Sequence, residues 1–127
     1  MTSSRVWLTA AGLAGLIGSA PAHAHHSAAM FDAGKTITLV GAVKEFKWAN
    51  PHASIAMLTT DDKGAQQVWN IECSTPNILV RKGWSMNSFK PGDTIKVTAH
   101  PMHDGSQAGL MMTVTTASGA ALKDHDY

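Results

Sequence analysis

Apolar and polar side chains alternate along much of the chain after residue 34, and this period of two predicts β-strands. The longest such segment, 36–48, is rich in β-branched and aromatic residues, and its apolar positions change from odd to even numbers near Gly41. A glycine where the period slips indicates a bulge or a sharp bend within one long strand. Shorter strands are predicted over 54–59, 67–73, 94–100 and 110–115.

A short helix is predicted between the third and fourth strands. Ser74 and Thr75 are suitable N-cap residues, Pro76 fits the first helical position, and Gly83 supplies a C-terminal stop. Three strands, a helix and two further strands, with a bent first strand, match the five-stranded OB barrel. We therefore predict an all-β domain with one short helix over 35–116, and a plain antiparallel β-sandwich is the alternative architecture.

The beginning of the chain has the three-part layout of a cleaved signal peptide over residues 1–24. Arg5 lies in a short polar start, an apolar stretch covers 6–17, and small residues lead up to Ala24. The apolar stretch is shorter than the roughly 20 residues needed to cross a bilayer, and each later apolar stretch is shorter than that too. We predict export to the periplasm and a mature chain without a transmembrane segment.

The mature chain should have loose ends on either side of the barrel. Residues 25–34 show no periodicity and are predicted to form a flexible N-terminal arm. Residues 117–127 are small and polar, and they are predicted to form a flexible tail.

Charge and motifs narrow the function. Loss of the leader removes Arg5 from ten basic residues and leaves nine against nine acidic ones, which argues against a nucleic-acid partner. The single cysteine, Cys73, cannot form an internal disulfide. The sequence contains no nucleophile elbow, no H-E-x-x-H motif and no P-loop, and its two glutamates, Glu45 and Glu72, lie on separate predicted strands. We therefore predict a protein that is not an enzyme.

Seven histidines in so short a chain point to metal binding. His52 lies in the loop after the first strand, whereas His100 and His103 flank the start of the loop between the fourth and fifth strands, with Met102 between them. In an OB barrel these loops lie on the same side of the fold. Neutral imidazole suits copper, zinc and nickel, and thioether sulfur adds a preference for Cu(I). We predict that His52, His100, His103 and Met102 are metal ligands.

The new N-terminus strengthens the case for copper. Cleavage after Ala24 gives His25 a free amine beside its own imidazole, and these two groups can chelate one copper ion, with His26 or a loop histidine as a third ligand. Cleavage after Ala22 instead places His25 third from a free amine, an arrangement that also binds Cu(II). The sequence thus predicts a non-catalytic periplasmic protein that binds a metal, with copper preferred.

An aromatic binding face is the alternative. Four aromatic residues could line one open face of the barrel and stack against a small ligand or a partner, with the histidines incidental. These residues are Phe46, Trp48, Trp69 and Trp84.

Short motifs spread over the mature chain resemble those of a family of small exported bacterial proteins of unknown function. They are His25-His26-Ser27, Asn50-Pro51-His52, Ser74-Thr75-Pro76-Asn77, Lys90-Pro91-Gly92-Asp93 and the stretch from His100-Pro101 to Asp104-Gly105. The resemblance implies no activity and no catalytic residues, so the chemistry has to be argued from the residues themselves.

Overall fold

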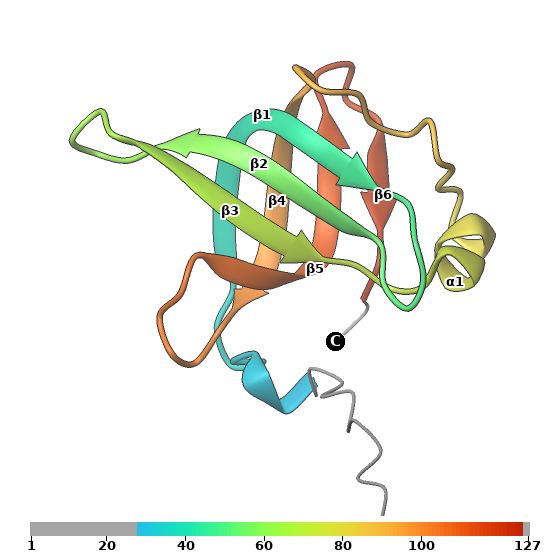
Figure 1. Ribbon diagram of the computed structural model, residues 1–127, viewed down its shortest axis with the longest axis horizontal. Helices are drawn as coiled ribbons and strands as arrows, with labels where there is room; N and C mark the ends of the chain where they lie inside the picture. Colours follow the sequence, from blue (N-terminus) through green and yellow to red (C-terminus); the bar gives the residue numbers. More distant parts are fainter. Residues whose placement is uncertain (1–27, 126–127) are drawn as a thin grey trace, which may run out of the picture.

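The computed structural model describes residues 28–125, which form one β-barrel with a short helix at one end (Figure 1). The predicted signal peptide and the first residues of the predicted arm, His25 and His26 included, lie outside the described residues. No helix among residues 28–125 is long and apolar enough to cross a membrane. The elements are η1 (Ala28–Met30), β1 (Ile37–Lys47), β2 (Ser54–Thr60), β3 (Gln66–Glu72), α1 (Pro76–Arg81), β4 (Thr94–Pro101), β5 (Ala108–Thr116) and β6 (Ala121–Lys123).

Five strands close the barrel because β1 pairs with two partners. Its first half, Ile37 to Ala42, runs antiparallel to β4, and its second half, Ala42 to Lys47, runs antiparallel to β2. The strand order is β3-β2-β1-β4-β5-β6, and a parallel pairing of β3 with β5 closes the ring. This confirms the predicted OB-like barrel with one short helix.

The change of partner in β1 needs a close approach of two backbones. A Cβ on Gly41 would meet the carbonyl oxygen of Leu58 and lie 2.9 Å from its carbonyl carbon. Glycine is therefore required where β1 crosses β2. The irregularity itself lies slightly further along the strand, where the β1–β2 register shifts between Val43 and Glu45.

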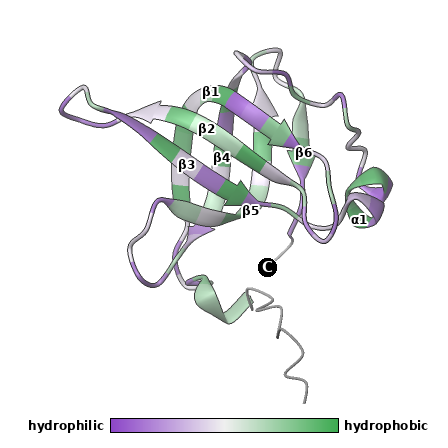
Figure 2. Ribbon diagram, viewed as in Figure 1, coloured by the Kyte–Doolittle hydropathy of each residue, from purple (hydrophilic) through white to green (hydrophobic). Residues whose placement is uncertain are grey.

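The core lies inside the barrel, and alternate residues of each strand point into it. On β2 the inward side chains are Ile55 and Met57, both fully buried, and Figure 2 shows the matching alternation of hydrophobic and hydrophilic residues along β3. Leu79 of α1 is also fully buried, so the helix packs on the barrel through this side chain.

The C-terminal end differs from the predicted flexible tail. Residues Ala121–Lys123 form β6 beside β5, and Asp124 is only 1% exposed. The amide of Ser74 donates to Oδ2 of Asp124 at 2.8 Å, and Nε1 of Trp84 donates to the carbonyl of Lys123 at 3.0 Å. A three-residue strand is too short to show a period, which explains why the sequence does not reveal it. We call residues 121–125 the C-terminal strap.

The described part of the predicted arm is also packed. Phe31 is 7% exposed and forms a β-bridge with Met102. The amide of Asp32 donates to the carbonyl of Pro101 at 2.8 Å, and the amide of His103 donates to that of Met30 at 3.0 Å. One buried aromatic side chain and two main-chain hydrogen bonds therefore hold this segment against the loop that follows β4.

Candidate functional site

Two hollows meet on the surface near the start of β2 and the end of β3. The helix-side pocket, of about 220 Å³, receives side chains from η1, α1, β5 and the C-terminal strap: Ala28, Ile78, Leu110 and His125. The sheet-side groove, of about 560 Å³, runs past the loop after β1 and includes Asn50, Asn70 and Met102. Phe31, His52 and Glu72 line both hollows and form their junction.

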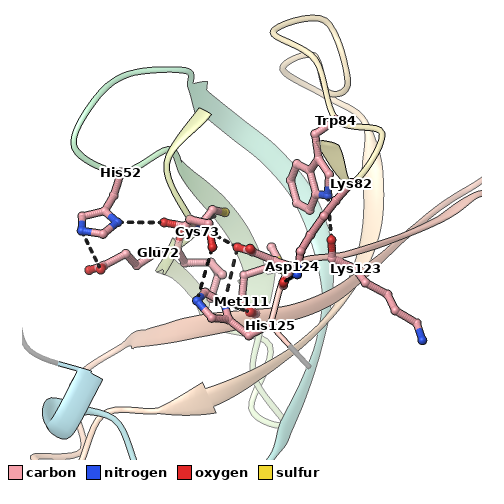
Figure 3. Close-up of polar contacts among 11 residues, drawn as sticks. His52, Glu72, Cys73, Lys82, Trp84, Met111, Lys123, Asp124 and His125 are labelled. Carbon is pink, nitrogen blue, oxygen red and sulfur yellow. Dashed lines mark hydrogen bonds and ion pairs between the residues drawn. The ribbon is translucent and has the colours of Figure 1, made fainter. Parts of the chain in front are cut away.

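His52 has a defined orientation at this junction. Its Nδ1 lies 3.2 Å from the carbonyl oxygen of Cys73, and because a carbonyl can only accept, Nδ1 carries the hydrogen. The other ring nitrogen, Nε2, faces Oε1 of Glu72 at 3.8 Å (Figure 3). Both side chains remain accessible, since 42% of the His52 side chain and 24% of the Glu72 side chain is exposed.

This geometry suits a shared cation. When His52 is neutral, Nε2 and Oε1 of Glu72 are two acceptors facing each other. A proton on Nε2 would turn the contact into an ion pair, and a metal ion between the two atoms would accept an electron pair from each. Metal–nitrogen and metal–oxygen bonds of about 2 Å each allow one ion to bridge a gap of this size. A bond from the far ring nitrogen to a main-chain carbonyl is also the usual support of a histidine ligand.

Met102 is the second predicted ligand that lies at these hollows. It lines the sheet-side groove, as His52 does, and its sulfur accepts a hydrogen bond from the hydroxyl of Ser106 at 3.2 Å. The structure therefore brings one imidazole and one thioether to the same groove.

His100 and His103 are placed elsewhere. β4 continues through Pro101, so His100 lies in the strand, where it is 4% exposed and its Nδ1 donates to the carbonyl of Lys35 at 2.6 Å. The side chain of His103 is 59% exposed, with Nδ1 3.9 Å from Oδ2 of Asp32. Neither residue lines either hollow. Within residues 28–125, no group of three or more His, Cys, Asp or Glu side chains is placed to hold a metal ion.

The four aromatic residues of the alternative prediction pack against the core. Trp84 is 2% exposed and makes edge-on contacts with the buried Phe89, with ring centroids 5.4 Å apart. Phe46 packs against Trp48 at 5.7 Å, and both are partly buried against the core, as is Trp69. Phe46 is in ring contact with Trp48, Trp84 and Phe89, whereas Trp69 packs against the core separately.

Two residues of the site were missed by the sequence analysis as ligand candidates, Glu72 and His125. Glu72 belongs to β3, and the alternation along this strand could have shown that its side chain points outward from the barrel. His125 lies in the strap, where its Nδ1 donates to the carbonyl of Met111 at 2.7 Å and its Nε2 lies 3.4 Å from the hydroxyl of Ser74. The sequence contains no period that would place it.

Cys73 is in the pocket lining, but its chemistry is that of a core residue. The residue is fully buried, and burial, followed by the nearby charges of Asp124 and Glu72, raises the pKa of its thiol well above the ordinary value. Because a metal binds the thiolate, this cysteine is a poor ligand at neutral pH.

The fold and its comparisons define the class of protein. A closed five-stranded barrel with a helix between β3 and β4 is an OB fold. The mitochondrial single-stranded DNA binding protein Rim1 of S. cerevisiae has a similar structure, with a TM-score of 0.50 and 12% identity over 65% of this chain and 93% of that chain. No curated protein matches the chain. The chain belongs to DUF6152, a family of unknown function, whose model matches residues 14–112.

Proposed function

We propose that this OB-fold protein is an exported, non-catalytic metal-binding protein with copper as its metal. The ion would sit at the junction of the two hollows and be held by Nε2 of His52. The observation that carries the proposal is the geometry of His52: its Nδ1 is engaged by the carbonyl of Cys73, and its Nε2 faces a carboxylate oxygen 3.8 Å away.

The remaining donors favour copper over harder metals. Met102 offers a thioether in the same groove, and Glu72 offers a carboxylate at the junction. His25 and His26, at the start of the predicted mature chain, would add nitrogen ligands to the one that His52 supplies. Mixed nitrogen and thioether ligands suit copper, whereas magnesium and calcium prefer oxygen ligands alone.

A small organic ligand in the sheet-side groove is the second candidate. The groove volume of about 560 Å³ falls in the range of small-molecule sites, and its lining combines apolar residues with the amides of Asn50 and Asn70. The similarity to Rim1 is not an argument for nucleic-acid binding, because 12% sequence identity supports a shared fold and not a shared ligand. The predicted mature chain also carries equal numbers of basic and acidic residues, which favours a ligand other than nucleic acid.

Calorimetric titration of the exported and processed protein tests the metal proposal. Cu(II), Cu(I), Zn(II) and Ni(II) are added separately, and we expect a copper form to bind with Kd below about 10 μM, equivalent to roughly 7 kcal/mol. His52→Ala should weaken binding by at least about tenfold, since it removes a ligand. His103→Ala is the matched control, because this exposed imidazole lies outside both hollows, and it should change Kd by less than about twofold.

Met102→Leu separates the two oxidation states. Loss of the thioether should weaken Cu(I) binding and leave Cu(II) binding nearly unchanged. If none of the four ions binds more tightly than about 10 μM, or if His52→Ala binds copper as well as the wild type does, the proposal is refuted.

A further inference from the structure

We infer that the sheet-side groove binds a dipeptide, with the peptide's ammonium group at Glu72, its carboxylate at Lys47, and its first side chain in the helix-side pocket. This inference rests on the second candidate function, an organic ligand in the groove, and gives that ligand a chemical class. It concerns the metal-free protein, so it can be tested apart from copper binding.

Two opposite charges lie in one row across the outer face of the sheet. Lys47 of β1 pairs with Ser54 of β2, and Ser54 pairs with Glu72 of β3. Residues directly opposite each other in antiparallel strands point to the same face of a sheet, and all three of these residues line the groove. Because neighbouring strands are about 4.8 Å apart, the main chains of Lys47 and Glu72 are separated by about 10 Å.

These charges select a ligand that is charged at both ends. Among the described residues that line the groove, Lys47 is the only lysine or arginine and Glu72 is the only carboxylate. A simple anion would be repelled by Glu72 and a simple cation by Lys47, whereas a zwitterion is attracted at both ends. The main chain of a dipeptide spans about 7 Å when extended, comparable with the spacing of the two strands, and a free amino acid spans only half of that.

The junction of the two hollows offers two acceptors to the ammonium group. Nδ1 of His52 donates to the carbonyl of Cys73, so Nε2 is an acceptor when the ring is neutral, and it lies 3.8 Å from Oε1 of Glu72. Figure 3 shows these two side chains facing each other. An ammonium nitrogen carries three hydrogens, and hydrogen bonds of about 2.9 Å let it donate to both atoms at once.

Neutral polar groups lie between and beside the charged ends. Ser54 stands between Lys47 and Glu72 in the row, and the side-chain amides of Asn50 and Asn70 also line the groove. A side-chain amide both donates and accepts, as a peptide group does, so these residues complement the peptide bond of the ligand. A neutral sugar would leave both charges without a partner.

The helix-side pocket extends the site beyond the ammonium group. Glu72 lines both hollows, whereas Lys47 lines the groove alone, so the first residue of the peptide would lie at the mouth of the pocket. The pocket has apolar side chains from three separate segments, namely Phe31, Ile78 and Leu110. Its volume of about 220 Å³ exceeds the roughly 150 Å³ of a cavity that holds benzene, so a leucine side chain fits. The site should therefore prefer a dipeptide with an apolar first residue.

Titration with the dipeptide Leu-Gly, followed in nitrogen–proton NMR correlation spectra, tests the inference. The exported and processed protein is first freed of metal with EDTA and dialysed. We expect Kd below about 1 mM, given the binding energy per atom that small ligands reach. The amide signals of Ser54 and Glu72 should shift, whereas that of Thr116, at the end of β5 away from the groove, should not.

Three related probes each remove one contact. N-acetyl-Leu-Gly lacks the ammonium group, the C-terminal amide of Leu-Gly lacks the carboxylate, and Gly-Gly lacks the apolar side chain. Each should bind at least about fivefold more weakly than Leu-Gly.

Matched variants assign each end of the peptide to its residue. Glu72→Gln should weaken Leu-Gly binding at least about fivefold and leave N-acetyl-Leu-Gly nearly unchanged, and Lys47→Gln should have the same pair of effects on Leu-Gly and its amide. Glu45→Gln and Lys44→Gln are the controls, because these exposed residues of β1 lie outside both hollows, and they should change Kd by less than about twofold. The modified peptides probe the same contacts in the wild-type protein, so the test stays decisive if Glu72→Gln is unstable.

The outcomes distinguish dipeptide binding from the proposed functions. If Leu-Gly binds more weakly than about 1 mM, or if the two blocked peptides bind as tightly as Leu-Gly, the inference is overturned. In the second case an organic ligand in the groove remains supported. Dipeptide binding by a protein that binds no ion more tightly than about 10 μM supports the inference and refutes the copper site, and copper binding without dipeptide binding does the reverse.

Discussion

Gly41→Ala should test the close crossing that closes the barrel. The added Cβ would meet the carbonyl group of Leu58, 2.9 Å from its carbon and closer still to its oxygen, and would lie 3.3 Å from Cα of Thr59. All three atoms belong to the backbone, so a change of rotamer cannot relieve the contact. Because carbon atoms prefer a separation of about 3.5 Å or more, β1 and β2 must move apart by at least about 0.6 Å.

The expected cost follows from that movement. Overpacking of this kind destabilises a protein by about 1–3 kcal/mol. The shift occurs beside the Ala42–Leu58 pair, where the β1–β2 ladder begins, and weakening one of its hydrogen bonds adds about 1 kcal/mol. We expect a total loss of about 2–4 kcal/mol, which for a domain of this size lowers Tm by roughly 10–30 °C.

Thermal and urea unfolding, followed by circular dichroism, measure this loss. Gly34→Ala is the matched control, because a Cβ there would meet only the end of the Asp32 side chain, at 3.3 Å. Its stability should change by less than about 1 kcal/mol. If Gly41→Ala unfolds within about 0.5 kcal/mol of the wild type, the β1–β2 crossing is not as close as described and the reasoning fails.

Three further predictions concern the core, the cysteine and an exposed turn. Leu79→Ala, at a fully buried helix position, should cost about 3 kcal/mol in urea unfolding, whereas Val80→Ala, at a 59% exposed position next to it, should cost less than about 0.5 kcal/mol. Because the raised pKa of Cys73 keeps its thiol neutral, native protein should react with iodoacetamide far more slowly than urea-unfolded protein, and equal alkylation rates would contradict this. The free energy of unfolding should also fall as the pH rises above about 8.5, because the exposed thiol of the unfolded chain ionises there. Hydrogen bonds from the side chain and main chain of Ser106 hold the pKa of Asp104 below its ordinary value, so a carboxyl NMR titration should place its midpoint there, and Ser106→Ala should move it upward; the stabilisation is present above the ordinary pKa and is lost as the pH falls.

Much of the fold could be predicted because each barrel strand has one face toward the core. Alternation on β2 and β4 reports that geometry directly, with Ile55, Met57, Ile95 and Val97 all buried. The bend of β1 was detectable because only glycine fits the crossing at position 41. The three-residue β6 could not be predicted because it is stabilised by pairing with β5, and three residues are too few to show the alternation of a strand.

The candidate site was less predictable, because it depends on where strands end. The expectation that His100 would join His52 assumed that β4 stops at residue 100. In fact β4 continues through Pro101, and a register shift after Thr98 leaves Ala99 and His100 both buried. Glu72 and His125 meet at one pocket although 53 positions separate them in the numbering. Only the closed barrel and the strap bring them together.

The parallel pairing of β3 with β5 has a consequence for when this protein can fold. It joins Asn70 to Ala108, across the helix and the whole of β4, and β1 must also reach forward to β4 before the ring closes. Contacts of such long sequence separation slow folding, because loop closure costs entropy before any of them forms. The strap that completes the pocket follows all five barrel strands in the chain. If the protein is exported as we propose, slow closure of the ring would favour crossing the membrane before the barrel folds, and the pocket would form only after residue 125 has crossed.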